Sequence, residues 1–182
     1  TEVQIMNYQL LENYYQELMY QIDEWSIGDY QQLFELASQK LESYPDNPVA
    51  LKYRGIANVH LLKADILKED RLEARNDLEM ALQREPGDTD VIYHLARWHL
   101  FEAHMQDRSG GDSIQAERHR DKALELAEQM LSLKPDDIDI LLDYISILVN
   151  PQLERKRQAE PIIDQLESVL MEDPRPDRKS VV

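Results

Sequence analysis

Apolar residues recur every three or four positions along the first 26 residues of the chain. This is the spacing of one face of an α-helix, and it predicts an amphipathic helix over residues 3–26. The stripe consists of Tyr8, Leu11, Tyr15, Leu18, Ile22 and Trp25. The stretch at residues 26–30, which contains Gly28, interrupts the pattern. A second helix is predicted over residues 29–43.

The boundary between two helices recurs later in the chain. Each time, an apolar helical end runs into a proline, a short turn containing Asp follows, and a new apolar periodicity begins in all but the last case. The four prolines are Pro45, Pro86, Pro135 and Pro174, and each has a leucine four positions before it. Proline does not continue a helix interior, and Asp near a helix start favours that start through capping and the helix dipole. The pattern therefore predicts a repeat of helix pairs.

Small residues stand at fixed positions within these repeats. They occur in the stretches Leu51-x2-Arg54-Gly55-x2-Asn58, Ile92-x2-Leu95-Ala96-x2-His99, Ala74-x3-Leu78 and Ala123-x3-Ala127. The order W-x2-L-G-x2-Y, A-x3-F and then P is the pattern of the tetratricopeptide repeat (TPR). Over roughly residues 29–174 the chain resembles the TPR family.

The resemblance implies an all-α fold, in which antiparallel helix pairs stack into a right-handed TPR-like superhelix of about seven to eight helices. We predict a single helical domain over residues 1–172 with a tail at residues 173–182. Within it, residues 1–48 form an atypical N-terminal helix pair. The repeats cover residues 49–86, 87–135 and 136–172.

The spacing of the prolines departs from the family. They lie 41, 49 and 39 residues apart, against about 34 in the consensus repeat. We expect helices longer than usual for the family in the first full pair, and a polar, glycine-bearing loop over residues 105–115 in the second. The last helix is expected to begin near Asn150. Pro161 is harmless there only if it lies in the first turn.

Composition excludes several classes of function. The formal net charge is −16, which disfavours binding to nucleic acids and to anionic membrane surfaces. The chain has no Cys, and no apolar run is long enough to span a membrane. It begins at Thr1 rather than Met, and we interpret it as an excised domain or mature fragment. We expect a soluble domain, either cytoplasmic or part of a larger membrane-anchored or exported protein.

The candidate chemistry is sparse. His94, His99 and His104 are spaced five apart and do not share a helical face, and no H-E-x-x-H motif occurs. A calcium-loop reading of residues 107–118 fails because Asp112 replaces the required glycine and the twelfth position lacks Glu. We therefore predict no catalytic residues, no metal site, no cofactor and no enzymatic activity.

In the TPR family, the first helix of each pair lines a concave groove that commonly holds a peptide or helix of a partner. The resemblance places eleven residues of this chain in that groove. They are Lys52, Tyr53, Ile56, His60, Tyr93, His94, Arg97, Phe101, Asp139, Asp143 and Ser146. One TPR subclass grips the C-terminal carboxylate of chaperones through basic residues. Asp139 and Asp143 occupy two of those positions with reversed charge, so we reject that specificity.

The sequence thus predicts a non-catalytic scaffold or adaptor that binds another protein or peptide. The alternative is a structural self-assembly module, in which the N-terminal helix packs against a second copy to form a homo-oligomer. The sequence does not identify the partner.

Overall fold

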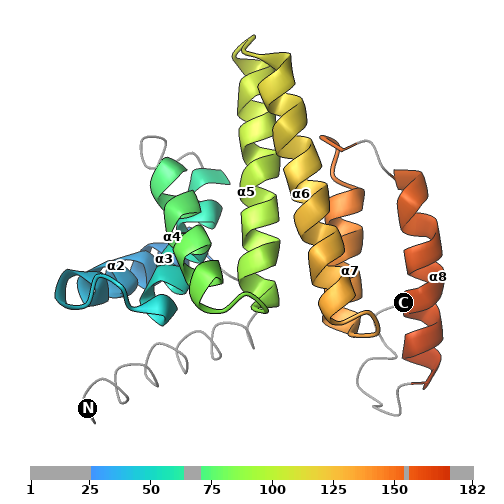
Figure 1. Cartoon of the computed structure of the whole chain (residues 1–182), viewed down its shortest axis with the longest axis horizontal. Coiled ribbons are helices and arrows are strands. Elements are labelled where there is room, and N and C mark those ends of the chain that lie inside the picture. Colours follow the sequence, from blue (N-terminus) through green and yellow to red (C-terminus); the bar gives the residue numbers. More distant parts are fainter. Residues whose placement is uncertain (1–25, 64–70, 154–155, 173–182) are drawn as a thin grey trace. The chain divides into compact units, whose positions relative to one another are not determined.

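The structure, a computed structural model, describes residues 26–63, 71–153 and 156–172 (Figure 1). These residues form seven α-helices and no strand, which confirms the all-α prediction for the described part of the chain. The helices are α2 (Ile27–Ser43), α3 (Pro48–Lys63), α4 (Arg71–Arg84), α5 (Thr89–Arg108), α6 (Ser113–Leu133), α7 (Ile138–Leu148) and α8 (Lys156–Glu172). The helix predicted over residues 3–26 and the tail at 173–182 lie outside the described residues, except for Ser26. None of the described helices is long and apolar enough to cross a membrane.

The three described joins between helix pairs are built alike. The residue two positions after each proline is Asn or Asp. Its amide donates a hydrogen bond to the carbonyl three residues earlier, with N···O distances of 3.1 to 3.4 Å. Its side chain accepts a hydrogen bond from a backbone amide in the first turn of the next helix, as an N-cap does. The three bonds run from Ala50 N to Asn47 Oδ1 (2.9 Å), from Val91 N to Asp88 Oδ1 (3.2 Å) and from Ile140 N to Asp137 Oδ1 (3.3 Å).

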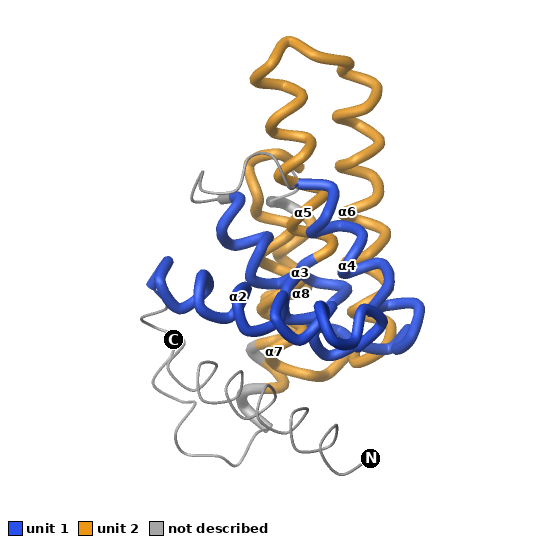
Figure 2. Tube along the Cα trace, turned by 90° about the vertical axis from the view of Figure 1, so that its left-hand side faces the viewer, with its two compact units in different colours: residues 1–94 blue, residues 95–182 orange. Residues whose placement is uncertain are grey.

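The chain divides into two compact units, residues 1–94 and 95–182, drawn in blue and orange in Figure 2. In the first unit, α3 packs against both α2 and α4. Helices α3 and α4 approach each other closely at Gly55. A Cβ atom at this position would lie 2.7 Å from Leu78 Cγ and 3.3 Å from the Ala74 carbonyl oxygen. Ala74 and Leu78 are fully buried, so the contact has no room for a larger residue.

A partly buried ion pair lies beside this contact. Arg54 donates two hydrogen bonds to the Asp77 carboxylate, from Nε at 2.6 Å and from Nη2 at 2.8 Å. Burial raises the pKa of Asp77, and the bonds from Arg54 offset this only in part. Removing one partner of such a pair leaves an uncompensated charge in the protein interior. Arg54 and Asp77 therefore hold α3 and α4 in one register.

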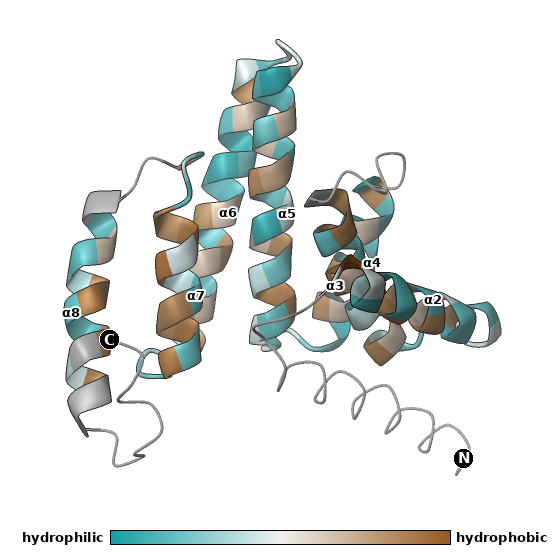
Figure 3. Cartoon of the chain, turned by 180° about the vertical axis from the view of Figure 1, so that it is seen from behind, coloured by the Kyte–Doolittle hydropathy of each residue, from teal (hydrophilic) through white to brown (hydrophobic). Residues whose placement is uncertain are grey.

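In the second unit, α6 packs against α7 and α7 against α8. Helix α7 is apolar over most of its length (Figure 3). Ile138 and Leu141 of α7 form a core cluster with Leu166 of α8. Ala123, one of the small residues of the repeat pattern, is fully buried on α6.

Two helix starts differ from the prediction. Helix α2 begins at Ile27 rather than at residue 29 because Ser26 and Asp29 form a capping box: Asp29 N donates to Ser26 Oγ (3.3 Å) and Ser26 N to Asp29 Oδ2 (2.9 Å). The last described helix begins at Lys156 rather than near Asn150, since residues 151–153 form a turn. Pro161 therefore lies inside α8, beyond its first turn.

The extra residues of the long repeat lie mainly in helices. The loop predicted over residues 105–115 is only the turn 109–112, because α5 continues to Arg108 and Asp112 caps α6. Gly110 has a φ of 64° in this turn, a conformation that suits glycine. Helices α5 and α6 have 20 and 21 residues, whereas α3 and α4 have 16 and 14. The expectation of longer helices than usual in the first full pair stays a prediction, because residues 64–70 between α3 and α4 lie outside the described residues.

We predict that Gly55→Ala destabilises the protein by about 1–3 kcal/mol, because its methyl group would overpack the site against Leu78. An exposed helix position behaves in the opposite way, since Ala is a better helix former than Gly. Gly28→Ala in the first turn of α2 is the matched control and should leave the stability unchanged or raise it. Urea unfolding monitored by circular dichroism measures both.

Measuring the effect of Gly55→Ala on the free energy of unfolding in a Leu78→Ala background tests the contact between residues 55 and 78. The loss caused by Gly55→Ala should shrink there, because the clashing atoms are gone. An equal loss in both backgrounds would show that Leu78 does not limit the approach of α3 and α4.

Candidate functional site

The eleven residues expected to line a groove lie on three helices. Helix α3 carries four of them, α5 four and α7 three. Tyr53 and Ile56 are 0% and 1% exposed, so these two side chains belong to the core and offer no surface to a partner. His94 is also largely buried.

In the first unit, a set of four rings in contact joins α2, α3 and α5. We call Tyr30, His60, His94 and Tyr93 the ring ladder. Tyr30 stacks on His60 with ring centroids 4.0 Å apart and an interplanar angle of 11°. His60 Nε2 lies 3.3 Å from His94 Nε2, and Tyr93 contacts His94 edge-on with centroids 5.2 Å apart. Three of the four were predicted site residues, and the structure brings these three together.

Lys52 is held by two carboxylates at the start of α5. Its Nζ lies 2.7 Å from Asp88 Oδ2 and 3.1 Å from Asp90 Oδ2. Burial acts to lower the pKa of Lys52, but the attraction of Asp90 and Asp88 outweighs it, so the pKa of Lys52 is raised. Since Asp88 is also the N-cap of α5, Lys52 links α3 to the following join. Lys52, predicted as a cation of the groove, thus forms ion pairs within the chain.

The remaining predicted residues belong to the second unit. Arg97 and Phe101 follow Tyr93 at intervals of four along α5, and all three are partly exposed. On α7, Asp139 and Ser146 are exposed and Asp143 is half-buried. The Ser146 hydroxyl donates to the Asp143 carbonyl oxygen at 2.8 Å.

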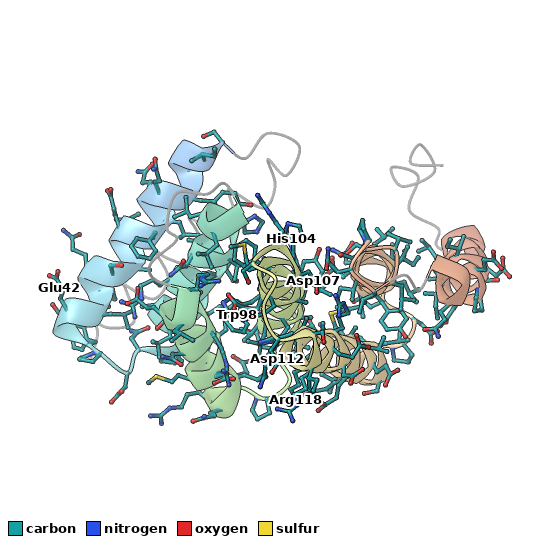
Figure 4. The ribbon with its side chains drawn as sticks, turned by 90° about the horizontal axis from the view of Figure 1, so that it is seen from above. Glu42, Trp98, His104, Asp107, Asp112 and Arg118 are labelled. Atoms are coloured by element: carbon teal, nitrogen blue, oxygen red, sulfur yellow. The ribbon has the colours of Figure 1, made fainter. Side chains whose placement is uncertain are left out.

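The second unit contains a histidine pair that sequence reasoning missed. His99 Nδ1 lies 2.8 Å from His119 Nδ1 of α6, and the Trp98 ring contacts both imidazoles edge-on. His104 Nδ1 lies 3.2 Å from Gln152 Nε2. Trp98 and His104 project from different sides of α5 (Figure 4). The partner of each histidine lies on another segment, so spacing along α5 gives no sign of it.

Over the described ranges, no three or more His, Asp or Glu side chains gather into a group able to hold a metal ion. In the turn compared above with a calcium loop, two of the side chains make contacts within the protein. Asp107 forms an ion pair with Arg120, and the Ser109 hydroxyl donates to the Gln106 carbonyl oxygen.

Antiparallel helices in sequential pairs, joined by turns of one design, define a TPR-like helical-repeat fold. Solved TPR structures share it over most of the chain. TTC0263, a thermophilic TPR protein of Thermus thermophilus, matches with a TM-score of 0.64 and 16% identity, over 90% of this chain and 74% of that one. The RS-1 MamA ArsTM double mutant matches with a TM-score of 0.55 and 18% identity, over 91% of this chain and 78% of that one.

A third similar structure, MamA MSR-1 C2, has a TM-score of 0.51 and 17% identity, over 80% of this chain and 70% of that one. At such identities the likeness concerns the fold. No family model matches the sequence, and no curated protein matches it.

We predict that Lys52→Gln lowers the free energy of unfolding by about 1–3 kcal/mol, because it leaves two carboxylates without their cation. Lys122→Gln is the control, since Lys122 and Glu125 form an exposed pair on α6, with side chains 44% and 65% exposed. Exposed pairs contribute at most about 1 kcal/mol. Urea unfolding of both variants decides the role of Lys52. Equal, small losses would mean that Lys52 does not tie α3 to α5.

Proposed function

We propose that this protein is a non-catalytic interaction module that binds a peptide or helix of another protein through α3, α5 and α7. The TPR-like fold, which is commonly a protein-interaction module, supports this proposal. Each of the three helices is the first of a pair and begins at a join of the same design. Equivalent positions on the three therefore recur from pair to pair, as a repeat-built binding surface requires.

The observation that carries the proposal is the stripe of Tyr93, Arg97 and Phe101 on α5. The three side chains recur every four residues, and each keeps part of its surface exposed. Tyr, Phe and Arg are enriched at protein interfaces, because they combine a large apolar contact with a polar or charged group. We assign the apolar anchoring of a partner to Tyr93 and Phe101, and the contact with its acidic or polar groups to Arg97.

The side chains near this stripe are assigned different roles. Tyr53 and Ile56 support α3 from the core, and Lys52 fixes the start of α5. The ring ladder holds Tyr93 against His94, so that little rotamer freedom is lost when a partner binds. Asp139, Asp143 and Ser146 give α7 an acidic and polar character, which suits basic or polar groups elsewhere on the partner.

We predict that Tyr93→Ala combined with Arg97→Glu abolishes partner capture while the domain stays folded. Loss of an aromatic anchor can cost about 2 kcal/mol or more, which corresponds to a roughly 30-fold weaker complex. The measurement is a pulldown with the tagged chain from its native lysate, followed by titration of the protein recovered. Circular dichroism confirms folding.

The control is Glu128→Arg, a charge reversal at an exposed position of α6, the second helix of its pair. It should capture the partner as the unmodified chain does. If the α5 variant still binds and Glu128→Arg does not, the binding face is on other helices. If light scattering instead shows concentration-dependent self-association and no partner is captured, the self-assembly alternative replaces the proposal.

A further inference from the structure

Helices α5 and α6 extend past the other helices of the second unit. His104 of α5 lies level with the turn that follows α7, because its Nδ1 is 3.2 Å from Gln152 Nε2. Residues 105–120, which come after this contact and include the turn 109–112, project beyond α7 and α8 (Figure 1). We call them the arm. The predicted groove residues all precede the arm or lie on α7, so the proposed function gives the arm no role.

The arm is held together by its own side chains. Arg120 of α6 forms an ion pair with Asp107 of α5. Ala116 is fully buried, and the Asp112 side chain caps α6 by accepting a hydrogen bond from Ile114 N at 2.9 Å. Two carboxylates of the arm are therefore already engaged within the chain.

One face of α5 continues onto the arm. Phe101, His104, Met105 and Arg108 stand at positions i, i+3, i+4 and i+7, which places them on one side of the helix. The first three are partly exposed and Arg108 is exposed. Ala103, on the opposite side of this stretch, is fully buried. We call the four residues the end stripe of α5.

The end stripe lies on a segment with little negative charge, in a chain of net charge −16. Over residues 91–106, α5 carries one carboxylate, Glu102, which is largely buried. Asp90 and Asp107, at the two ends of this stretch, are each ion-paired within the chain. Within the part of the chain that the structure describes, no residue forms an ion pair or hydrogen bond with the Arg108 guanidinium. Its charge is thus available to another molecule.

The composition of the end stripe is that of an interface. Arg108 stands in the last turn of α5, where the helix dipole favours a cation. The dipole does not account for the partly exposed Phe101 and Met105 beside it. Aromatic residues, Met and Arg are the types enriched where proteins bind one another, and the stripe contains all three.

We propose that the end stripe binds an acidic amphipathic helix of another protein. Apolar side chains one turn apart on that helix pack against Phe101 and Met105, and a carboxylate about one turn further on pairs with Arg108, since neighbouring helices have the same rise per residue. Arg108 thereby selects an acidic partner, because it would repel a basic group. The inference rests on the proposed function, since the partner bound along α5 is the same one, and it extends the contact past Phe101.

The test uses two capped helical peptides of alanine and glutamine. The first carries leucines along one face and glutamate at both ends of that face, and the second has lysine in place of each glutamate. Fluorescence anisotropy measures the binding of both to the full chain. The unmodified chain should prefer the glutamate peptide. Arg108→Glu should weaken its binding about fivefold or more, because an exposed ion pair is replaced by a like-charge contact, and Arg108→Lys should retain it.

The matched control is Arg118→Glu, which should leave the affinity unchanged. Arg118 is also exposed, but it lies on α6, on the side of the hairpin away from His104 (Figure 4). Equal affinity of the unmodified chain for the two peptides, binding of neither, or equal weakening by Arg118→Glu and Arg108→Glu overturns the proposal.

Methyl NMR of the methionines locates the bound peptide without any variant. On addition of the glutamate peptide, the Met105 methyl resonance should shift. The resonances of Met80, which is 38% exposed on α4, and of Met130, which is buried on α6, should stay in place. An unmoved Met105 resonance, or a shift at Met80 as large as at Met105, contradicts the proposal.

Partner capture by the variant that combines Tyr93→Ala with Arg97→Glu separates this inference from the proposed function. If the glutamate peptide leaves Met105 unmoved while that variant loses its partner, α5 binds a partner that is not an acidic helix reaching Arg108, and only this inference is wrong. If the variant also keeps its partner, the proposed function is wrong as well.

Discussion

The side-chain cap of each join is the interaction on which the rest of this structure depends. A helix ends shortly before a proline, and two residues later an Asn or Asp side chain binds the amides that open the next helix. The proline removes the option of a continued helix, and the cap satisfies amides that would otherwise lack partners. The join therefore fixes the starting residue of α3, α5 and α7. Every equivalence between positions on these helices follows from it.

Further contacts of α3 hold neighbouring helices together. The absence of a side chain at Gly55 lets α3 approach Leu78 of α4, and the Arg54–Asp77 pair holds the two helices in register. Lys52 then connects α3 to Asp88, the cap of the following join. One helix is thereby tied to its own pair and to the next one.

The fold was predictable from sequence because its determinants are local. The prolines, the capping Asn and Asp residues, and the small residues at Gly55 and Ala74 each act within one join or one crossing. Helix starts that no proline precedes, those of α2 and α6, were predicted less well. Ser26 starts α2 earlier than Gly28 suggested, and Asp112 shortens the loop between α5 and α6.

The candidate site was only partly predictable, because its contacts join separate helices. The sequence, through its resemblance to the TPR family, placed Tyr53 and Ile56 on a binding face, but both are buried where α3 packs against α2 and α4. The sequence analysis considered only the spacing of the histidines along α5. In the structure, His94 contacts His60 and His99 contacts His119. The sequence offered Lys52 as a cation for a partner, and two Asp residues of the same chain bind it.

The direct test of this account is the free energy of unfolding of five single alanine variants in urea. Asn47→Ala and Asp137→Ala should each lose about 0.5–2 kcal/mol, the usual effect of removing a cap. Asp88→Ala should lose more, since Asp88 also binds Lys52. Asp46→Ala and Asp136→Ala, one residue before two of the caps, should unfold nearly as the unmodified chain does. If Asp46→Ala and Asp136→Ala cost as much as the cap variants, the joins do not set the register of the repeats.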